Sequence, residues 1–194
     1  MSKKIIFTNG LIDLAQPRLG TKVIYKTDDF FASASRIIDP LPAVFKEGIF
    51  DKNGKWMDGW ESRRKRNKGH DYIILKLGKP GSIKKIDVDT SHFNGNQPAM
   101  ISIEGTNSIS NKINQFKWKP LLSKKKTQAN SHHFFNINNR KTFTHIKFNI
   151  FPDGGVARLR LFGSIAKSNK LKNKKTNLAS LLDGASVIAC NNEH

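Results

Sequence analysis

The stretch DGWESRRKRNKGHDY, residues 58–72, brings acids, arginines, an imidazole and an indole into one short polar segment. A solvated run of charge accounts for its lysines but not for the other residue types. Glu and His side chains tuned toward neutral pH transfer protons, and Arg side chains hold a carboxylate through two parallel hydrogen bonds. We therefore interpret the stretch as one wall of a site for a small anion.

Three further polar clusters lie at strand ends or in loops: residues 87–98, Glu104, and Asp153 with Arg158. Asp87 and Asp89 fall on one face of a strand, because side chains repeat every two residues. Two like charges there require cations, hydrogen bonds or a metal ion to join them. Taken singly, each acid is equally well explained as a turn cap or as the partner of a nearby arginine.

The histidines give weaker signals. His70 directly precedes Asp71, so a carboxylate could orient its imidazole, but a lone loop histidine is more often only a hydrogen-bonding group. His132 and His133 lie in a polar segment with no acid at ligand spacing, and we interpret them as surface residues. The sequence has no Gly-rich phosphate loop, no Ser nucleophile elbow and no His-x-x-x-His pair. No spacing requires a metal, and we predict neither a metal nor a cofactor.

The charge balance is strongly basic, with 34 Lys and Arg against 15 Asp and Glu and a net charge of +19. Such a balance usually indicates nucleic acid or a membrane surface as the partner. Here 26 of the basic residues are Lys, accompanied by 18 Asn, a skew typical of coding bias. The basic residues also form no stripe interleaved with aromatics of the kind that binds nucleic acid by stacking. We therefore predict neither nucleic acid nor a membrane as a partner.

The eight arginines are more informative, because five of them lie in two short stretches, at positions 63, 64, 66, 158 and 160. In a lysine-rich chain this clustering indicates that planar guanidinium groups bind a carboxylate through two hydrogen bonds. Better packing of Arg at these positions is an alternative explanation. The single cysteine, Cys190, excludes an internal disulfide framework and a Cys-based zinc site. No stretch resembles a signal peptide or approaches the length of a membrane span. We expect a soluble, cytoplasmic protein.

Short apolar or alternating runs predict strands at residues 21–25, 72–78, 83–90, 99–106, 144–151 and 156–163. Turn residues at 79–81, 94–96 and 153–155 separate the later strands. Residues 32–69 are rich in Gly and Pro and predict a long loop region, and residues 107–143 predict a polar insertion. Because no convincing amphipathic helix is present, the pattern favours an all-β, antiparallel sandwich.

The tail indicates an internal repeat. Residues 167–175 form a charged linker, and residues 177–193 then align without gaps to residues 13–29 at a constant offset of 164. Five positions are identical, including the Leu-Ala, Gly and Val-Ile positions that would serve the same turn and strand twice. We therefore expect one whole domain over residues 1–166, followed by the beginning of a second, truncated copy over residues 176–194.

Together these motifs resemble the allantoicase family. The resemblance rests on DGWE-x-RR, GHD, DVDT-x-x-F-x-GN-x-P and PDGG-x-AR, which occur here at 58–64, 69–71, 87–98 and 152–158. It covers nearly the whole chain and implies a jelly-roll sandwich of the galactose-binding-like type. It also implies a hydrolase of purine breakdown that converts allantoate and water into ureidoglycolate and urea. Family members carry two repeats, so the resemblance further implies a homo-oligomer or a second repeat on a separate chain.

The resemblance supports one set of site residues as a group. Glu61 and His70 are expected to transfer protons, with Asp71 or Asp153 orienting them. The expected substrate-binding residues are Trp60, Arg63, Arg64, Asp89, Asn96 and Arg158. Two alternatives stay open: a non-catalytic galactose-binding-like module, and an inactive fragment of a split gene. The loops hold acids, arginines and a histidine rather than exposed aromatics, which favours the enzyme.

Overall fold

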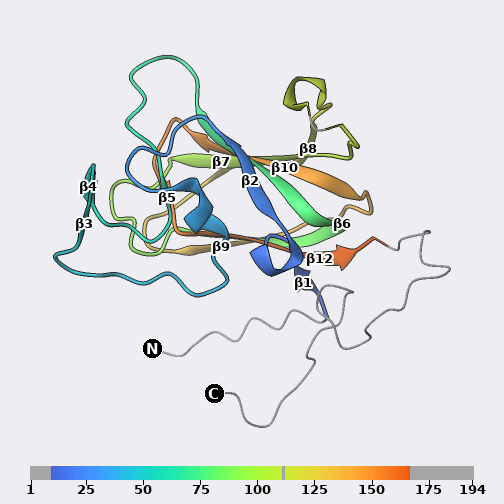
Figure 1. Cartoon of the computed structure of the whole chain (residues 1–194), viewed down its shortest axis with the longest axis horizontal. Helices are drawn as coiled ribbons and strands as arrows, with labels where there is room; N and C mark the ends of the chain where they lie inside the picture. The colour runs from blue at the N-terminus through green and yellow to red at the C-terminus, as the bar shows by residue number, and fades with distance from the viewer. Residues whose placement is uncertain (1–9, 111, 167–194) are drawn as a thin grey trace, which may run out of the picture.

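The computed structural model describes residues 10–110 and 112–166 (Figure 1). The expected linker and the start of a second repeat lie outside these residues. The described strands are β1 (Ile12–Asp13), β2 (Lys22–Lys26), β3 (Phe50–Asp51), β4 (Gly54–Lys55), β5 (Trp60–Glu61), β6 (Asp71–Asp89), β7 (Met100–Thr106), β8 (Lys119–Lys126), β9 (His132–Asn136), β10 (Phe143–Phe151), β11 (Gly155–Val156) and β12 (Arg158–Ile165). Three short 3-10 helices accompany them: η1 (Pro17–Leu19), η2 (Ala34–Ile38) and η3 (Ile113–Gln115).

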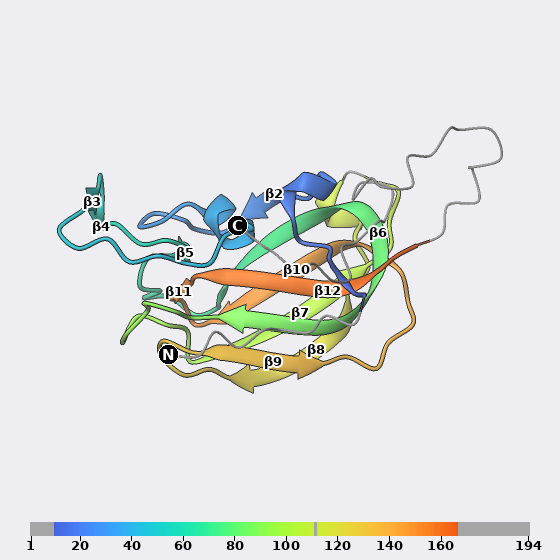
Figure 2. The ribbon, with the colours of Figure 1, turned by 90° about the horizontal axis from the view of Figure 1, so that it is seen from below.

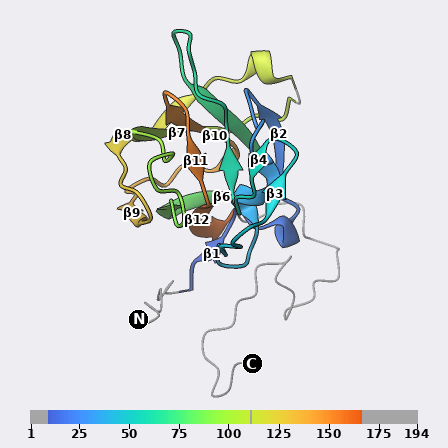
Figure 3. The same cartoon turned by 90° about the vertical axis from the view of Figure 1, so that its left-hand side faces the viewer.

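The main sheet folds over into two facing layers (Figures 2 and 3). One layer has the order β2-β6-β10-β7-β8, and the other has β1-β12-β6-β9, with every neighbouring pair antiparallel. The long strand β6 belongs to both, because residues 71–76 pair with β10 and residues 81–89 pair with β12. The prediction of an all-β, antiparallel jelly-roll sandwich is therefore confirmed.

The turn predicted at residues 79–81 is wrong, because β6 continues through it without a break. Here the strand passes from one layer to the other, and two glycines let other backbones approach it closely. A Cβ on Gly78 would lie 2.0 Å from the carbonyl oxygen of Leu19 in η1, and one on Gly81 would lie 2.6 Å from that of Ser164 in β12. The Pro-Gly signal thus marks a crossing point rather than a chain reversal.

The polar insertion predicted at residues 107–143 is also corrected, since this segment supplies β8 and β9. Each strand lies at the edge of one layer, and most of its residues are exposed. Lysines are common on such edges because they discourage pairing with another chain, and β8 carries four of them. Leu122 is the buried residue that joins β8 to the core.

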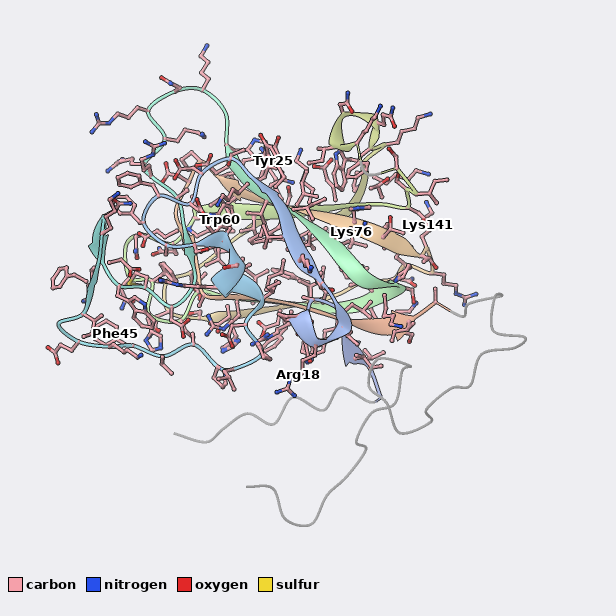
Figure 4. All side chains as sticks on the ribbon, in the orientation of Figure 1. Arg18, Tyr25, Phe45, Trp60, Lys76 and Lys141 are labelled. Carbon is pink, nitrogen blue, oxygen red and sulfur yellow. The ribbon has the colours of Figure 1, made fainter. Side chains whose placement is uncertain are left out.

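The core lies between the layers and is filled by inward-facing side chains of the long strands. It includes Ile73 and Leu75 from the first part of β6, and Ile86 and Val88 from its second part. Trp60 on β5 is fully buried at the loop end of this core, with its ring edge against Phe148 (Figure 4). Within the described residues, no helix is long and apolar enough to cross a membrane.

The crossing in β6 generates a first prediction. Gly78→Ala should destabilise the protein by about 1–3 kcal/mol, because the new methyl group would push η1 away from β6 and disturb the hydrogen bond from Gly78 to Thr21 Oγ1. Urea unfolding curves would measure this loss. Lys79→Ala, one residue further along the same strand, is the control and should change the free energy of unfolding little. Equal effects of the two substitutions would contradict this account of the crossing.

Candidate active site

The loop end of the sandwich is closed by β5, which lies between β11 and the chain at Ala32. Glu61 is opposite Gly155 on one side and exchanges two backbone hydrogen bonds with Ala32 on the other. Gly155 is required because a Cβ there would lie 2.0 Å from the ring of Phe93. Since side chains alternate along a strand, Trp60 enters the core and Glu61 points away from it.

Glu61 and Asn96, two of the predicted site residues, are in contact. Asn96 Nδ2 donates a hydrogen bond of 2.8 Å to Glu61 Oε1. The backbone carbonyl of Asn96 in turn accepts a hydrogen bond of 2.7 Å from Gly155, which fixes its position next to β11. Burial raises the pKa of Glu61 above its ordinary value, and the hydrogen bond from Asn96 opposes this shift. A carboxyl group of raised pKa suits proton transfer near neutral pH.

A pocket of about 560 Å³ opens beside the loop between β5 and β6. Its lining residues are Asp28, Phe30, Phe31, Arg63, Arg64, Lys65, Arg66, Asn67 and Asp71. This loop rises away from the sandwich at the top of the view (Figure 3). Two predicted substrate-binding residues, Arg63 and Arg64, and one predicted catalytic residue, Asp71, therefore share one pocket.

Hydrogen-bonding groups of Arg63 are used in contacts within the protein. Its Nε and its backbone N–H donate hydrogen bonds of 2.7 and 2.8 Å to the carboxylate of Asp28, and its guanidinium lies 4.9 Å from the ring centre of Phe30. Partial burial opposes ionisation of Asp28, but these hydrogen bonds prevail and hold its pKa below the ordinary value. In the described part of the chain, by contrast, Arg64 and Arg66 have no hydrogen-bond or ion-pair partner. They are the two guanidinium groups at the pocket that remain available for an anion.

Asp71 lies at the base of this pocket and is 1% exposed. Its Oδ1 accepts a hydrogen bond of 2.8 Å from Thr27 Oγ1 and forms an ion pair of 2.8 Å with Lys65 Nζ. Its Oδ2 is buried and has no hydrogen-bond partner. Asp153 accepts a hydrogen bond of 2.7 Å from the backbone N–H of Lys65. Two predicted catalytic carboxylates are thus connected through one lysine.

His70 does not form the predicted pair with Asp71. Its Nε2 lies 3.0 Å from Oδ1 of Asn149, and its ring centre lies 4.4 Å from that of Phe151, with the two rings tilted by 31°. Asn149 in turn donates to Ser102 and Glu104, so that His70 and Glu104 belong to one polar network across β10 and β7. His70 is not among the residues that line the pocket.

Trp60 and Arg158 hold structural positions that differ from those expected. Trp60 is fully buried, and its indole N–H donates to the carbonyl of Asp28, so no ligand at the surface can reach it. Arg158 is 2% exposed, and its guanidinium donates to the carbonyls of Leu41 and Asp58 and to the Asp58 carboxylate at 2.7 Å. The buried guanidinium therefore ties residues 41–58 to β12 instead of facing the pocket.

Asp89 also lies away from the pocket, on the outer face of the layer that contains β9. Asp87 and Asp89 are buried side by side, as their spacing predicts, and the imidazole of His132 joins them. His132 Nδ1 lies 2.9 Å from Asp87, and its Nε2 lies 3.7 Å from Asp89. His132 is exposed, as its interpretation as a surface residue predicts, but the sequence did not show that it pairs with two acids. The hydrogen bond to Asp87 is the main cause that raises the pKa of His132, against an opposing effect of burial.

Six of the nine lining residues were not among the predicted site residues: Asp28, Phe30, Phe31, Lys65, Arg66 and Asn67. One of them, Arg66, belongs to the arginine cluster. The continuous RRKR run of residues 63–66 was a signal for Lys65 and Arg66. Only the structure shows that Arg63 and Lys65 pair with carboxylates of the protein whereas Arg64 and Arg66 do not. Asp28 gives no sequence signal, since it reaches Arg63 across 35 residues of chain. Within residues 10–110 and 112–166, no three His, Cys, Asp or Glu side chains are grouped so that they could hold a metal ion.

The fold and the place of the pocket define a galactose-binding-like domain with its polar site at the loop end. A family 32 carbohydrate-binding module from C. perfringens, solved in complex with galactose, matches with a TM-score of 0.53 at 16% identity, over 78% of this chain and 99% of that chain. At that identity the likeness concerns the fold alone.

Sequence comparison identifies the family. The model described as the allantoicase repeat matches residues 12–166. A probable allantoicase of Pseudomonas fluorescens strain SBW25 is 50% identical over 186 residues, which make up 94% of this chain and 56% of that relative. Probable allantoicase 2 of Burkholderia mallei is 41% identical over 97% of this chain and 57% of its own length. The chain therefore belongs to the allantoicase family, as the motifs predicted.

Solved structures agree with this assignment. A structure of allantoicase matches with a TM-score of 0.80 at 30% identity, covering 98% of this chain and 58% of that chain. The allantoicase of Saccharomyces cerevisiae matches with a TM-score of 0.72 at 32% identity, over 84% and 51%. The chain thus spans a little over half the length of the relatives it matches.

The contact between Glu61 and Asn96 generates a second prediction. Asn96→Ala should raise the pKa of Glu61 further, because the hydrogen bond that favours the ionised form is lost while burial remains. Titration of the Glu61 carboxyl carbon by NMR would measure the change. Asn94→Ala, in the same loop but exposed, is the matched control and should leave the titration of Glu61 unaltered. A fall or no change in the Asn96→Ala variant would contradict the assignment.

The pair of His132 and Asp87 generates a third prediction. Because the pKa of His132 is raised in the folded state, the imidazolium stabilises the fold below the ordinary histidine pKa of about 6.5. That contribution is lost as the pH rises through the raised value. His132→Gln should therefore lower the free energy of unfolding more at about pH 5 than at about pH 8.5. Urea unfolding at both pH values tests this, and an equal loss at both would refute it.

Proposed function

We propose that this chain acts as an allantoicase-type hydrolase, which converts allantoate and water to ureidoglycolate and urea in purine breakdown. The observation that carries the proposal is the pocket in which the unpaired guanidinium groups of Arg64 and Arg66 lie near the buried carboxylate of Asp71. The names of the relatives support the same substrate, since those relatives are probable allantoicases.

The pocket has groups suited to each part of allantoate. The substrate carries one carboxylate and two ureido arms on a single carbon. Guanidinium groups bind carboxylates through paired, charge-assisted hydrogen bonds. We therefore assign binding of the allantoate carboxylate to Arg64 and Arg66. Asp71 lines the pocket and is the candidate acceptor for ureido N–H groups, because a carboxylate offers several acceptor positions and one of its oxygens has no hydrogen-bond partner among the described residues.

In the proposed reaction a water oxygen bonds to the central carbon, and the bond from that carbon to one ureido nitrogen breaks. The departing nitrogen takes up a proton and leaves as urea, and the proton lost by water balances it. Glu61 is the candidate for these transfers, because burial raises its pKa. Ala32, which pairs with Glu61, directly follows Phe31 in the pocket wall. Asp153 orients the loop through Lys65.

Partner and domain assignments belong to the same proposal. We assign residues 1–166 to the first repeat, 167–175 to a linker and 176–194 to the start of a second repeat. The relatives that match over 56–60% of their length have room for such a repeat. A homo-oligomer or a second repeat on a separate chain would then accompany this one, in the cytoplasm.

Urea release from allantoate by the purified 194-residue chain tests the proposed function. Glu61→Gln should lower kcat by about 10²–10⁴-fold, because the amide cannot transfer the proton. Arg64→Met should mainly raise KM, because it removes a contact with the substrate carboxylate.

Lys68→Met is the charge-matched control in the same loop, outside the pocket lining, and should retain wild-type rates. If the folded wild-type chain releases no urea, the proposal that this chain is active by itself is wrong. Allantoate binding without turnover would then favour a ligand-binding module.

A further inference from the structure

Lys65 connects the two carboxylates that flank the loop between β5 and β6. Its Nζ lies 2.8 Å from Asp71 Oδ1, and its backbone N–H donates at 2.7 Å to Asp153 Oδ2. Asp71 begins β6, whereas Asp153 follows the end of β10. One residue of the loop therefore holds groups from two different strand ends.

The burial of Asp71 favours its ion pair with Lys65. An ionised carboxylate that is 1% exposed is costly unless a cation or hydrogen bonds compensate for its lost hydration. Thr27 supplies one hydrogen bond, and the second oxygen of Asp71 has no partner. Lys65 is thus the sole ion-pair partner of Asp71 among the described residues. At 24% exposure, its own side chain is largely withdrawn from solvent.

We infer that Lys65 is a positioning residue: its side chain holds the Asp71 carboxyl group in place at the pocket, and its backbone N–H ties the loop that presents Arg64 and Arg66 to Asp153. The inference rests on the proposed function, since it concerns the same pocket. Because the side chain of Lys65 pairs with Asp71, it affects the substrate indirectly, through the position of that carboxyl group. Loss of the Lys65 side chain leaves the backbone hydrogen bond to Asp153 in place, and with it the loop that carries Arg64 and Arg66. It should therefore affect the reaction more than the binding of allantoate.

Steady-state kinetics of allantoate hydrolysis test the inference. Lys65→Met should lower kcat by about 10²-fold, the order expected when a reacting group is misplaced by about 1 Å, with KM changed less than about threefold. Lys65→Arg should recover most of kcat, because a guanidinium can still pair with Asp71. The neighbouring control Lys68→Met should match the wild type. A rise in KM with unchanged kcat, or failure of Lys65→Arg to recover activity beyond Lys65→Met, would overturn the positioning role.

A second measurement does not depend on turnover. In the ¹⁵N–¹H spectrum of the lysine side chains, Lys65 Nζ should give a signal protected from solvent exchange, which Asp71→Asn should abolish. If the wild-type chain releases no urea but this signal is present and depends on Asp71, the proposed function fails and the ion pair that underlies the inference stands. If the signal is absent or unaffected by Asp71→Asn, the inference fails, whatever the activity.

Discussion

Side-chain alternation along β6 places a carboxylate at the end of the row of apolar residues that fills the core. Asp71 lies on the same face as Ile73 and Leu75, because side chains of a strand repeat every two residues. A charge in that position must be compensated within the protein, and Thr27 and Lys65 supply the compensation. The conformation of the loop that carries Lys65, and with it the pocket, depends on this buried carboxylate.

The sequence predicts the long strands of the sandwich well, because their alternation reflects burial of one face. It predicts the crossing in β6 poorly, since Pro80 and Gly81 give the same local signal for a reversal and for a close approach of another backbone. The edge strands β8 and β9 were hidden for a different reason. β8 carries four lysines, and three of the five residues of β9 are polar, so composition alone makes both look like loops.

For the site, the chemical type of a residue predicts whether it lies at the loop end of the sandwich better than it predicts the role of that residue. Glu61 and Asn96 lie far apart in sequence yet meet as expected, because both belong to segments that must pass the end of the sandwich. Arg158 has the right chemistry for a substrate carboxylate, but the same five donors also suit it to bind backbone carbonyls. Sequence cannot separate these uses, since both need a guanidinium and only the neighbouring backbone decides between them.

The run of cations from Arg63 to Arg66 shows how a charged stretch can be divided between structure and ligand. Arg63 and Lys65 pair with Asp28 and Asp71. Arg64 and Arg66 have no such partner among the described residues, and both are exposed. All four side chains line the pocket, but carboxylates of the protein hold two of them. The two ion pairs therefore do more than neutralise charge, because they determine which two guanidinium groups remain available to an anion.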